Sequence, residues 1–145
     1  MEINIGIIGL GTVGTGVIEL YHQQQSFLET ALNLKINLKA ICARSTATLD
    51  SFDLPGVKKT THPLEICQDP EIQVVIEVAG GYEEPRKWVL EALKHKKQII
   101  TANKALLAKF GHEIFPLAKR NNCSVLFEAA VGGSIPIIKT LQESL

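Results

Sequence analysis

The sequence has no excess charge of either sign, because 15 Lys and Arg residues balance 15 Asp and Glu residues. A balanced chain presents no general electrostatic field to nucleic acid or to an anionic membrane surface. Any anion-binding site must therefore be local. The 145 residues, 46% of them hydrophobic, suffice for one core and predict a single domain.

Cysteines are also few, since the chain has three and none stands in a Cys-x-x-Cys pair. Cys42, Cys67 and Cys123 lie among apolar neighbours, so we expect buried thiols in a reducing compartment, the cytoplasm. The stretch from Ile3 to Ile18 is apolar, but Glu2 replaces the basic start of a signal peptide and glycines interrupt the run. It is predicted to be neither a signal peptide nor a membrane span.

The most informative feature is a Gly-x-Gly-x-x-Gly turn that directly follows an apolar, strand-like segment. Gly9 suits a tight turn, Gly11 a close approach of the backbone to a pyrophosphate, and Gly14 the packing of the next helix. Free N–H groups at that helix's N-terminus would face the phosphates. The pattern predicts a dinucleotide site, and a tight turn without a ligand is the alternative. The predicted contact residues are Gly9, Leu10, Gly11, Thr12, Val13 and Gly14.

Strand-like and helix-like segments alternate along the rest of the chain. Further strands are expected at 36–43, 74–78, 98–101 and 124–128. Helices are expected at 12–33, from 61–63 onward, at 85–96, and at 104–121 with a break or bend near Gly111. The alternation predicts an α/β fold: a Rossmann-type, doubly wound, mostly parallel sheet in a single domain. Ligands of such sheets bind outside the carboxyl ends of the strands.

Arg44 and Ser45 follow the predicted second strand, where NAD-preferring domains usually carry Asp or Glu. An arginine can meet a 2′-phosphate with two parallel charge-assisted bonds, so the cofactor is predicted to be NADP rather than NAD. The alternative is that Arg44 starts a solvated loop. The separation of Gly14 from Arg44 exceeds the usual spacing of about twenty residues and requires an extended first helix.

Lys104 lies where a strand is predicted to end and a helix to begin. The helix dipole disfavours a cation there, so we expect a compensating phosphate, nicotinamide carboxamide or reacting alkoxide. The alternative is a lysine extended into water.

A third candidate is Glu128, which precedes Gly132 and Gly133 at a predicted strand end. A carboxylate and inward-turned carbonyl oxygens could hold a hard cation, but spacing alone favours a glycine-rich hinge. Beyond it, a predicted helix carries Ile137, Ile138, Leu141 and Leu145 on one face.

Four of these segments, in this order along the chain, resemble homoserine dehydrogenases. They are residues 9–14, 77–81, 101–108 and 128–138. The resemblance implies an NAD(P)-binding Rossmann domain at 1–133 and, at 134–145, the start of a helix leading into a substrate and dimerisation domain absent from this chain. We therefore expect a truncated chain that binds cofactor without turnover.

The resemblance also implies the activity, which is the NAD(P)-dependent interconversion of L-homoserine and L-aspartate 4-semialdehyde, toward threonine, methionine and isoleucine. It implies that Thr101 and Lys104 lie nearest the nicotinamide and that Lys104 transfers a proton. A monovalent cation, usually Na⁺, is implied at Glu128, Val131, Gly133 and Ile135, chiefly through backbone oxygens. A homo-oligomer is implied as well. The balanced charge, by contrast, is the reason to expect no nucleic-acid or membrane partner.

Two other functions stay open at this point. One is another two-domain NADP-dependent dehydrogenase that shares this front half, which the Asn103-Lys104 and 131–138 motifs argue against. The other is a module that senses NADP(H) without turnover.

Overall fold

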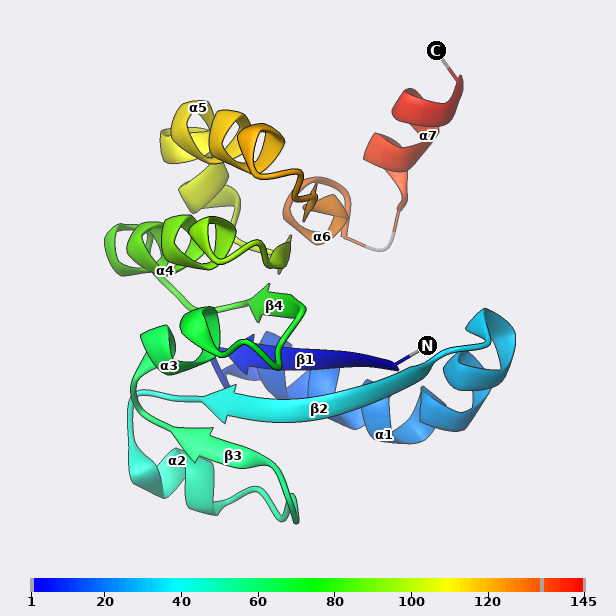
Figure 1. Ribbon diagram of the computed structural model, residues 1–145, viewed down its shortest axis with the longest axis vertical. Coiled ribbons are helices and arrows are strands. Elements are labelled where there is room, and N and C mark those ends of the chain that lie inside the picture. Colours follow the sequence, from blue (N-terminus) through cyan, green and yellow to red (C-terminus); the bar gives the residue numbers. More distant parts are fainter. Residues whose placement is uncertain (1, 134, 145) are drawn as a thin grey trace.

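The computed structural model describes residues 2–133 and 135–144, which form a six-stranded parallel sheet with helices on both faces (Figure 1). The strand order is β3-β2-β1-β4-β5-β6. The strands are β1 (Glu2–Ile8), β2 (Lys35–Cys42), β3 (Lys58–Thr60), β4 (Val74–Glu77), β5 (Gln98–Thr101) and β6 (Val125–Leu126). This order confirms the predicted doubly wound Rossmann-type sheet.

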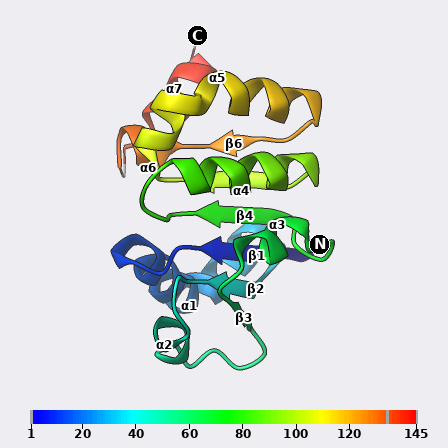
Figure 2. The same cartoon turned by 90° about the vertical axis from the view of Figure 1, so that its left-hand side faces the viewer.

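The helices are α1 (Thr12–Leu32), α2 (Thr46–Asp50), α3 (Pro63–Gln68), α4 (Glu83–Lys94), α5 (Lys104–Arg120), α6 (Glu128–Val131) and α7 (Ile137–Ser144). Figure 2 looks onto the face that carries α3, α4 and α5, with α1 on the far side. Among the described residues, no helix is both long and apolar enough to cross a membrane.

Successive strand residues point to opposite faces, which divides the interior into two cores. Ile7 packs with Ile18 of α1 in one core, and Ile8 packs with Val89 of α4 in the other. Both isoleucines are at most 1% exposed. The last residues of β1 are therefore buried on both sides, which holds the following glycine turn in place.

Most predicted elements are confirmed to within two residues, but three details are wrong. The α5 helix is continuous through the buried Gly111, so of the predicted break or bend the break does not occur. The predicted strand 124–128 is reduced to β6, because Glu128 begins α6. The thiol of Cys123 is only half-buried, whereas Cys42 and Cys67 are buried as expected.

The α4 helix also begins two residues earlier than predicted, at Glu83. Pro85 lies in its first turn, where a missing N–H costs no helical hydrogen bond. The helix ends at Lys94, before the left-handed backbone of Lys96. Sequence reasoning did not find α2 and β3, which are short and largely exposed.

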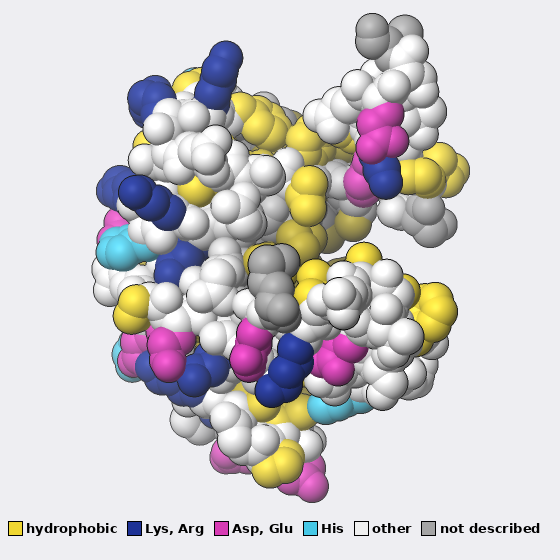
Figure 3. All heavy atoms as spheres, turned by 45° about the vertical axis from the view of Figure 1, so that its right-hand side comes forward, with side chains coloured by type: hydrophobic (Ala, Val, Ile, Leu, Met, Phe, Trp, Pro, Cys, Tyr) yellow, Lys and Arg dark blue, Asp and Glu magenta, His cyan; other side chains and the backbone are white. Residues whose placement is uncertain are grey.

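The α7 helix projects from the rest of the molecule (Figures 1 and 3). It contacts α6, and hydrophobic side chains line the hollow beneath it in Figure 3. Exposed hydrophobic residues in this part of the chain include Leu126, Val131, Ile135 and Leu141. Leu145 and Ser134, which fell within predicted features, lie outside the described residues.

Candidate functional site

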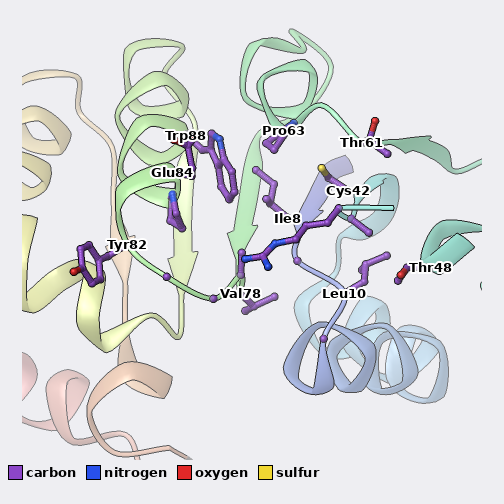
Figure 4. A pocket seen from close by; sticks show the side chains of 18 of the residues that line it. Ile8, Leu10, Cys42, Thr48, Thr61, Pro63, Val78, Tyr82, Glu84 and Trp88 are labelled. Atoms are coloured by element: carbon purple, nitrogen blue, oxygen red, sulfur yellow. The ribbon is translucent and has the colours of Figure 1, made fainter. Parts of the chain in front are cut away.

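A cleft of about 970 Å³ opens at the carboxyl ends of β1, β2 and β4 (Figure 4). Its size is in the range of small-molecule and cofactor sites. The lining comes from the glycine turn after β1, the segment after β2, the loop after β4, the start of α3 and the first two turns of α4. The structure thus brings together residues 9–11, Arg44 and residues 78–81, which lie far apart in the sequence.

Two glycines of the turn are required by packing within the protein. Gly9 has a φ of 106°, and a Cβ there would lie 2.6 Å from the backbone nitrogen of Ala79. A Cβ on Gly14 would overlap the carbonyl oxygen of Gly9. Both positions therefore need glycine whether or not a ligand binds.

No comparable packing constraint within the described part of the protein requires glycine at position 11. Its φ of −80° is open to any residue, and apart from its two chain neighbours no described atom lies within 4 Å of where its Cβ would stand. Gly11 lines the cleft and is the N-cap of α1. Its lack of a side chain leaves room for a ligand to approach the backbone, which is the role predicted for it.

The N-terminus of α1 is also suited to an anion. Gly11 has no side chain that could cap the helix, and the first turn carries no acidic residue. The first N–H groups of a helix have no partner within it, and the helix dipole adds partial positive charge. These properties favour a phosphate at this end of the cleft.

Arg44 lies at the β2 side of the cleft and its side chain is exposed. Within the described part of the chain, its guanidinium forms no ion pair or hydrogen bond. Ser45 caps α2 by accepting a hydrogen bond of 3.3 Å from the backbone N–H of Thr48. The positive charge of Arg44 is therefore available to a bound anion.

Sequence reasoning did not single out Glu77 as a functional residue, yet it organises the loops after β4 and β5. Its carboxylate is 0% exposed and accepts hydrogen bonds from the hydroxyl of Thr101 (2.7 Å) and the backbone N–H of Ala79 (3.0 Å). Burial raises the pKa of Glu77. An acidic residue ending the apolar segment Val74–Glu77 is the signal that could have identified it.

The amide of Asn103 connects this network to α5. Its Nδ2 donates to the carbonyl oxygen of Gly81 at 2.8 Å and to Glu77 at 3.4 Å, while its Oδ1 accepts from the backbone N–H of Leu106 at 3.0 Å. Asn103 is therefore the N-cap of α5. It fixes where the helix starts and holds the loop that lines the cleft.

Lys104 and Thr101 do not line this cleft. Lys104 is the first residue of α5, is exposed, and forms no ion pair with another described residue. Thr101 is 1% exposed, and its hydroxyl donates to Glu77 instead of facing the cleft. The two residues lie beyond the loop after β4, at the β5 side of the same sheet edge.

The predicted cation residues lie at α6 and in the turn that follows it. Both carboxylate oxygens of Glu128 accept backbone hydrogen bonds, from Ile138 at 3.1 Å and Lys139 at 2.6 Å, which ties α6 to α7. Val131 and Ile135 are exposed, and Gly133 has a φ of 60°. Over residues 2–133 and 135–144, no group of three or more His, Cys, Asp and Glu side chains is placed to hold a metal ion.

Comparison with known proteins agrees with this geometry. Residues 9–128 match the family model of the homoserine dehydrogenase NAD-binding domain. A homoserine dehydrogenase of Synechocystis is 44% identical over 145 residues, which cover 100% of this chain and 33% of the relative. The chain therefore spans about one third of the length of the curated relatives that it matches.

Solved structures show the same relationship. A crystal structure of homoserine dehydrogenase from Thiobacillus denitrificans superimposes with a TM-score of 0.91 at 38% identity, over 100% of this chain and 33% of that one. A hyperthermophilic archaeal homoserine dehydrogenase mutant in complex with NADPH gives a TM-score of 0.81 at 26% identity, over 100% and 49%. This chain belongs to the homoserine dehydrogenase family and corresponds to the NAD-binding domain of its members.

Proposed function

We propose that the protein is an NADP-dependent homoserine dehydrogenase, which interconverts L-homoserine and L-aspartate 4-semialdehyde, and that residues 1–133 are its cofactor-binding domain. The main support is the cleft itself, in which Gly11 and the uncapped start of α1 are open to a phosphate. The family match and the archaeal relative solved with NADPH are consistent with this proposal.

Arg44 supports NADP over NAD. Its guanidinium lines the cleft directly after β2, where a carboxylate would repel a 2′-phosphate and an arginine attracts it. Glycines 9, 11 and 14, with Leu10, Thr12 and Val13, would hold the pyrophosphate at the start of α1.

Lys104 is the proposed catalytic residue. A bound nicotinamide would supply or accept the hydride, and the ε-amine of Lys104 would exchange a proton with the substrate hydroxyl oxygen. Glu77 and Asn103 would position Lys104 by fixing the start of α5. Thr101 would lie near the nicotinamide through its backbone, because its hydroxyl is bonded to Glu77.

The substrate would be held by a further domain to which residues 134–145 lead. The exposure of Lys104 supports this, since a proton-transfer group at a closed active site is shielded from bulk water. The exposed Ile137 and Leu141 of α7 are consistent with a continuing structure on that side. For the 145-residue chain alone, we infer cofactor binding without turnover, in a cytoplasmic protein that is a homo-oligomer when complete.

We also propose a monovalent cation, Na⁺, at Glu128, Val131, Gly133 and Ile135. The carboxylate of Glu128 already accepts hydrogen bonds from backbone N–H groups of α7, so backbone carbonyl oxygens would be the cation ligands. A carbonyl oxygen that accepts one hydrogen bond still has a second lone pair for a cation. The melting temperature of the chain should then be higher in sodium chloride than in tetramethylammonium chloride at the same concentration. Equal melting temperatures in the two salts would remove the cation from the proposal.

The activity is tested by NADP⁺ reduction with L-homoserine, using the complete protein that contains this chain. We expect homoserine-dependent formation of NADPH, and slower formation of NADH at the same cofactor concentration. Binding of NADPH without turnover of homoserine in the complete protein would favour a sensing module. Turnover of a different substrate only would favour another dehydrogenase.

A further inference from the structure

One wall of the cleft carries an aromatic side chain that the proposed roles do not use. Trp88 of α4 and Pro63 of α3 line this wall, opposite Leu10 and Val78 (Figure 4). The two helices pack against each other on the same face of the sheet. Trp88 is half-buried, so it packs partly on the core beneath α4 and leaves the rest of its surface at the cleft.

Nothing else in the described chain pairs with this ring. The stacked or tilted aromatic pairs involve other residues, and no cation lies over the indole. The indole N–H also makes no hydrogen bond to a described residue, although a half-buried tryptophan usually finds one. A large aromatic surface next to an apolar proline is suited to a planar, apolar ring.

Two planar groups of the cofactor could meet Trp88, the adenine and the nicotinamide. Arg44 and Trp88 line the same cleft, whereas Lys104 does not. The 2′-phosphate that Arg44 would bind is on the ribose that carries the adenine, and the nicotinamide would lie toward Lys104. The adenine is therefore the ring within reach of Trp88.

We infer that Trp88 stacks on the adenine ring of NADP(H), in a slot completed by Pro63. This inference rests on the proposed function and names the residues that hold the base. Loss of a single base–aromatic stack weakens binding by roughly 5- to 150-fold. Most of the selectivity for the 2′-phosphate remains with Arg44, so Trp88 would contribute equally to NADP and NAD affinity.

The sequence makes the test direct, because Trp88 is its only tryptophan. Fluorescence of the 145-residue chain, excited selectively at tryptophan, is followed during titration with adenosine 2′,5′-bisphosphate and, separately, with nicotinamide mononucleotide. The bisphosphate carries the adenine and the 2′-phosphate but no nicotinamide. We expect it to quench Trp88, and the mononucleotide to leave Trp88 unchanged at the same concentration.

Two variants separate stacking from packing. Trp88→Phe keeps an aromatic face and should bind the bisphosphate within about threefold of the wild type, whereas Trp88→Leu keeps apolar bulk but should bind roughly 5- to 150-fold more weakly. Calorimetry measures both affinities, and melting temperatures confirm that both variants fold. Trp88→Leu should weaken the binding of 5′-AMP and of the bisphosphate by the same factor, whereas Arg44→Ala should weaken the binding of the bisphosphate only.

The outcomes distinguish this inference from the proposed function. If the bisphosphate binds with equal affinity to the wild type and to Trp88→Leu, Trp88 does not stack on the adenine, while the proposed cofactor site is unaffected. Quenching by the mononucleotide alone would place the nicotinamide at Trp88 and overturn the inference. If neither the bisphosphate nor NADPH binds, the proposed function and the inference both fail.

Discussion

The hydroxyl of Thr101 donates a 2.7 Å hydrogen bond to the buried carboxylate of Glu77, which joins the ends of β4 and β5. The backbone N–H of Asn103 donates in turn to the Thr101 hydroxyl at 3.0 Å. One carboxylate thereby connects the loop lining the cleft to the first turn of α5. The position of Lys104 relative to the cleft depends on this connection.

Glu77 should make the stability of the chain pH-dependent. Burial raises its pKa above the ordinary value of 4.5, so the folded state holds the proton more tightly than the unfolded state. The resulting stabilisation is complete below pH 4.5 and is lost as the pH rises through the folded-state pKa. The free energy of unfolding of the wild type relative to Glu77→Gln should fall from pH 4.5 toward neutrality, measured by urea denaturation.

The control for this measurement is Glu19→Gln, which changes an exposed carboxylate on α1. It should keep the pH dependence of the wild type. A wild-type advantage over Glu77→Gln that grows with rising pH would mean that the hydrogen bonds to the carboxylate outweigh its burial.

Alanine at Gly14 should mainly lower the stability of the chain, whereas alanine at Gly11 should mainly weaken cofactor binding. Gly14→Ala should cost about 1–3 kcal/mol of stability or more, because its methyl group overlaps the carbonyl oxygen of Gly9. Gly11→Ala should cost about 1 kcal/mol or less, because the position is open and the only loss is that alanine is a poorer N-cap than glycine. It should weaken NADPH binding by about tenfold or more, because the methyl group blocks the pyrophosphate. Urea denaturation and cofactor titration measure the two effects, and normal NADPH binding by Gly11→Ala would exclude a phosphate at this turn.

Arg44→Ala should remove the preference for NADP. We expect a loss of about 1.5–3 kcal/mol in NADPH binding, the range for hydrogen bonds to charged groups, and little change for NADH. Arg120→Ala is a matched control, because Arg120 is exposed at the far end of α5. Calorimetric titration of both variants with both cofactors is the measurement. Equal losses for NADPH and NADH would show that Arg44 does not contact the 2′-phosphate.

Lys104→Ala, made in the complete protein, should lower kcat by about two to four orders of magnitude, the usual contribution of general acid–base catalysis. Cofactor affinity should change much less. If Lys104 only offset negative charge on the cofactor, Lys104→Ala would weaken cofactor binding and leave kcat nearly unchanged. A near-normal kcat at saturating cofactor, with chemistry rate-limiting, would exclude Lys104 from proton transfer.

The sheet and the glycine turn could be predicted because their signals are local. The apolar run of Glu2–Ile8 and the glycines after it specify a strand followed by a helix, and β2, β4 and β5 show similar runs. By contrast, β3 has only three residues, two of them exposed lysines, and it forms because β2 offers it a free edge. Short polar strands of this kind have no periodic pattern to detect.

The contacts that complete the site are tertiary and were not predictable from spacing. Glu77 and Thr101 are 24 residues apart, and only the pairing of β4 with β5 places them together. Glu128 was expected at a strand end, but its carboxylate bonds to backbone groups of α7 ten residues later. Arg44 and Trp88 line one cleft because α4 packs over β4 and β5 and against α3, at the sheet edge where β2 also ends.

The central claim is that the cleft at the glycine turn binds NADP(H), and calorimetric titration of the 145-residue chain with NADPH and with NADH tests it most directly. The account predicts one NADPH bound per chain, a weaker affinity for NADH, and competition of NADPH with adenosine 2′,5′-bisphosphate. Absence of NADPH binding by the folded chain, or equal binding of both cofactors that Gly11→Ala leaves unchanged, would contradict it.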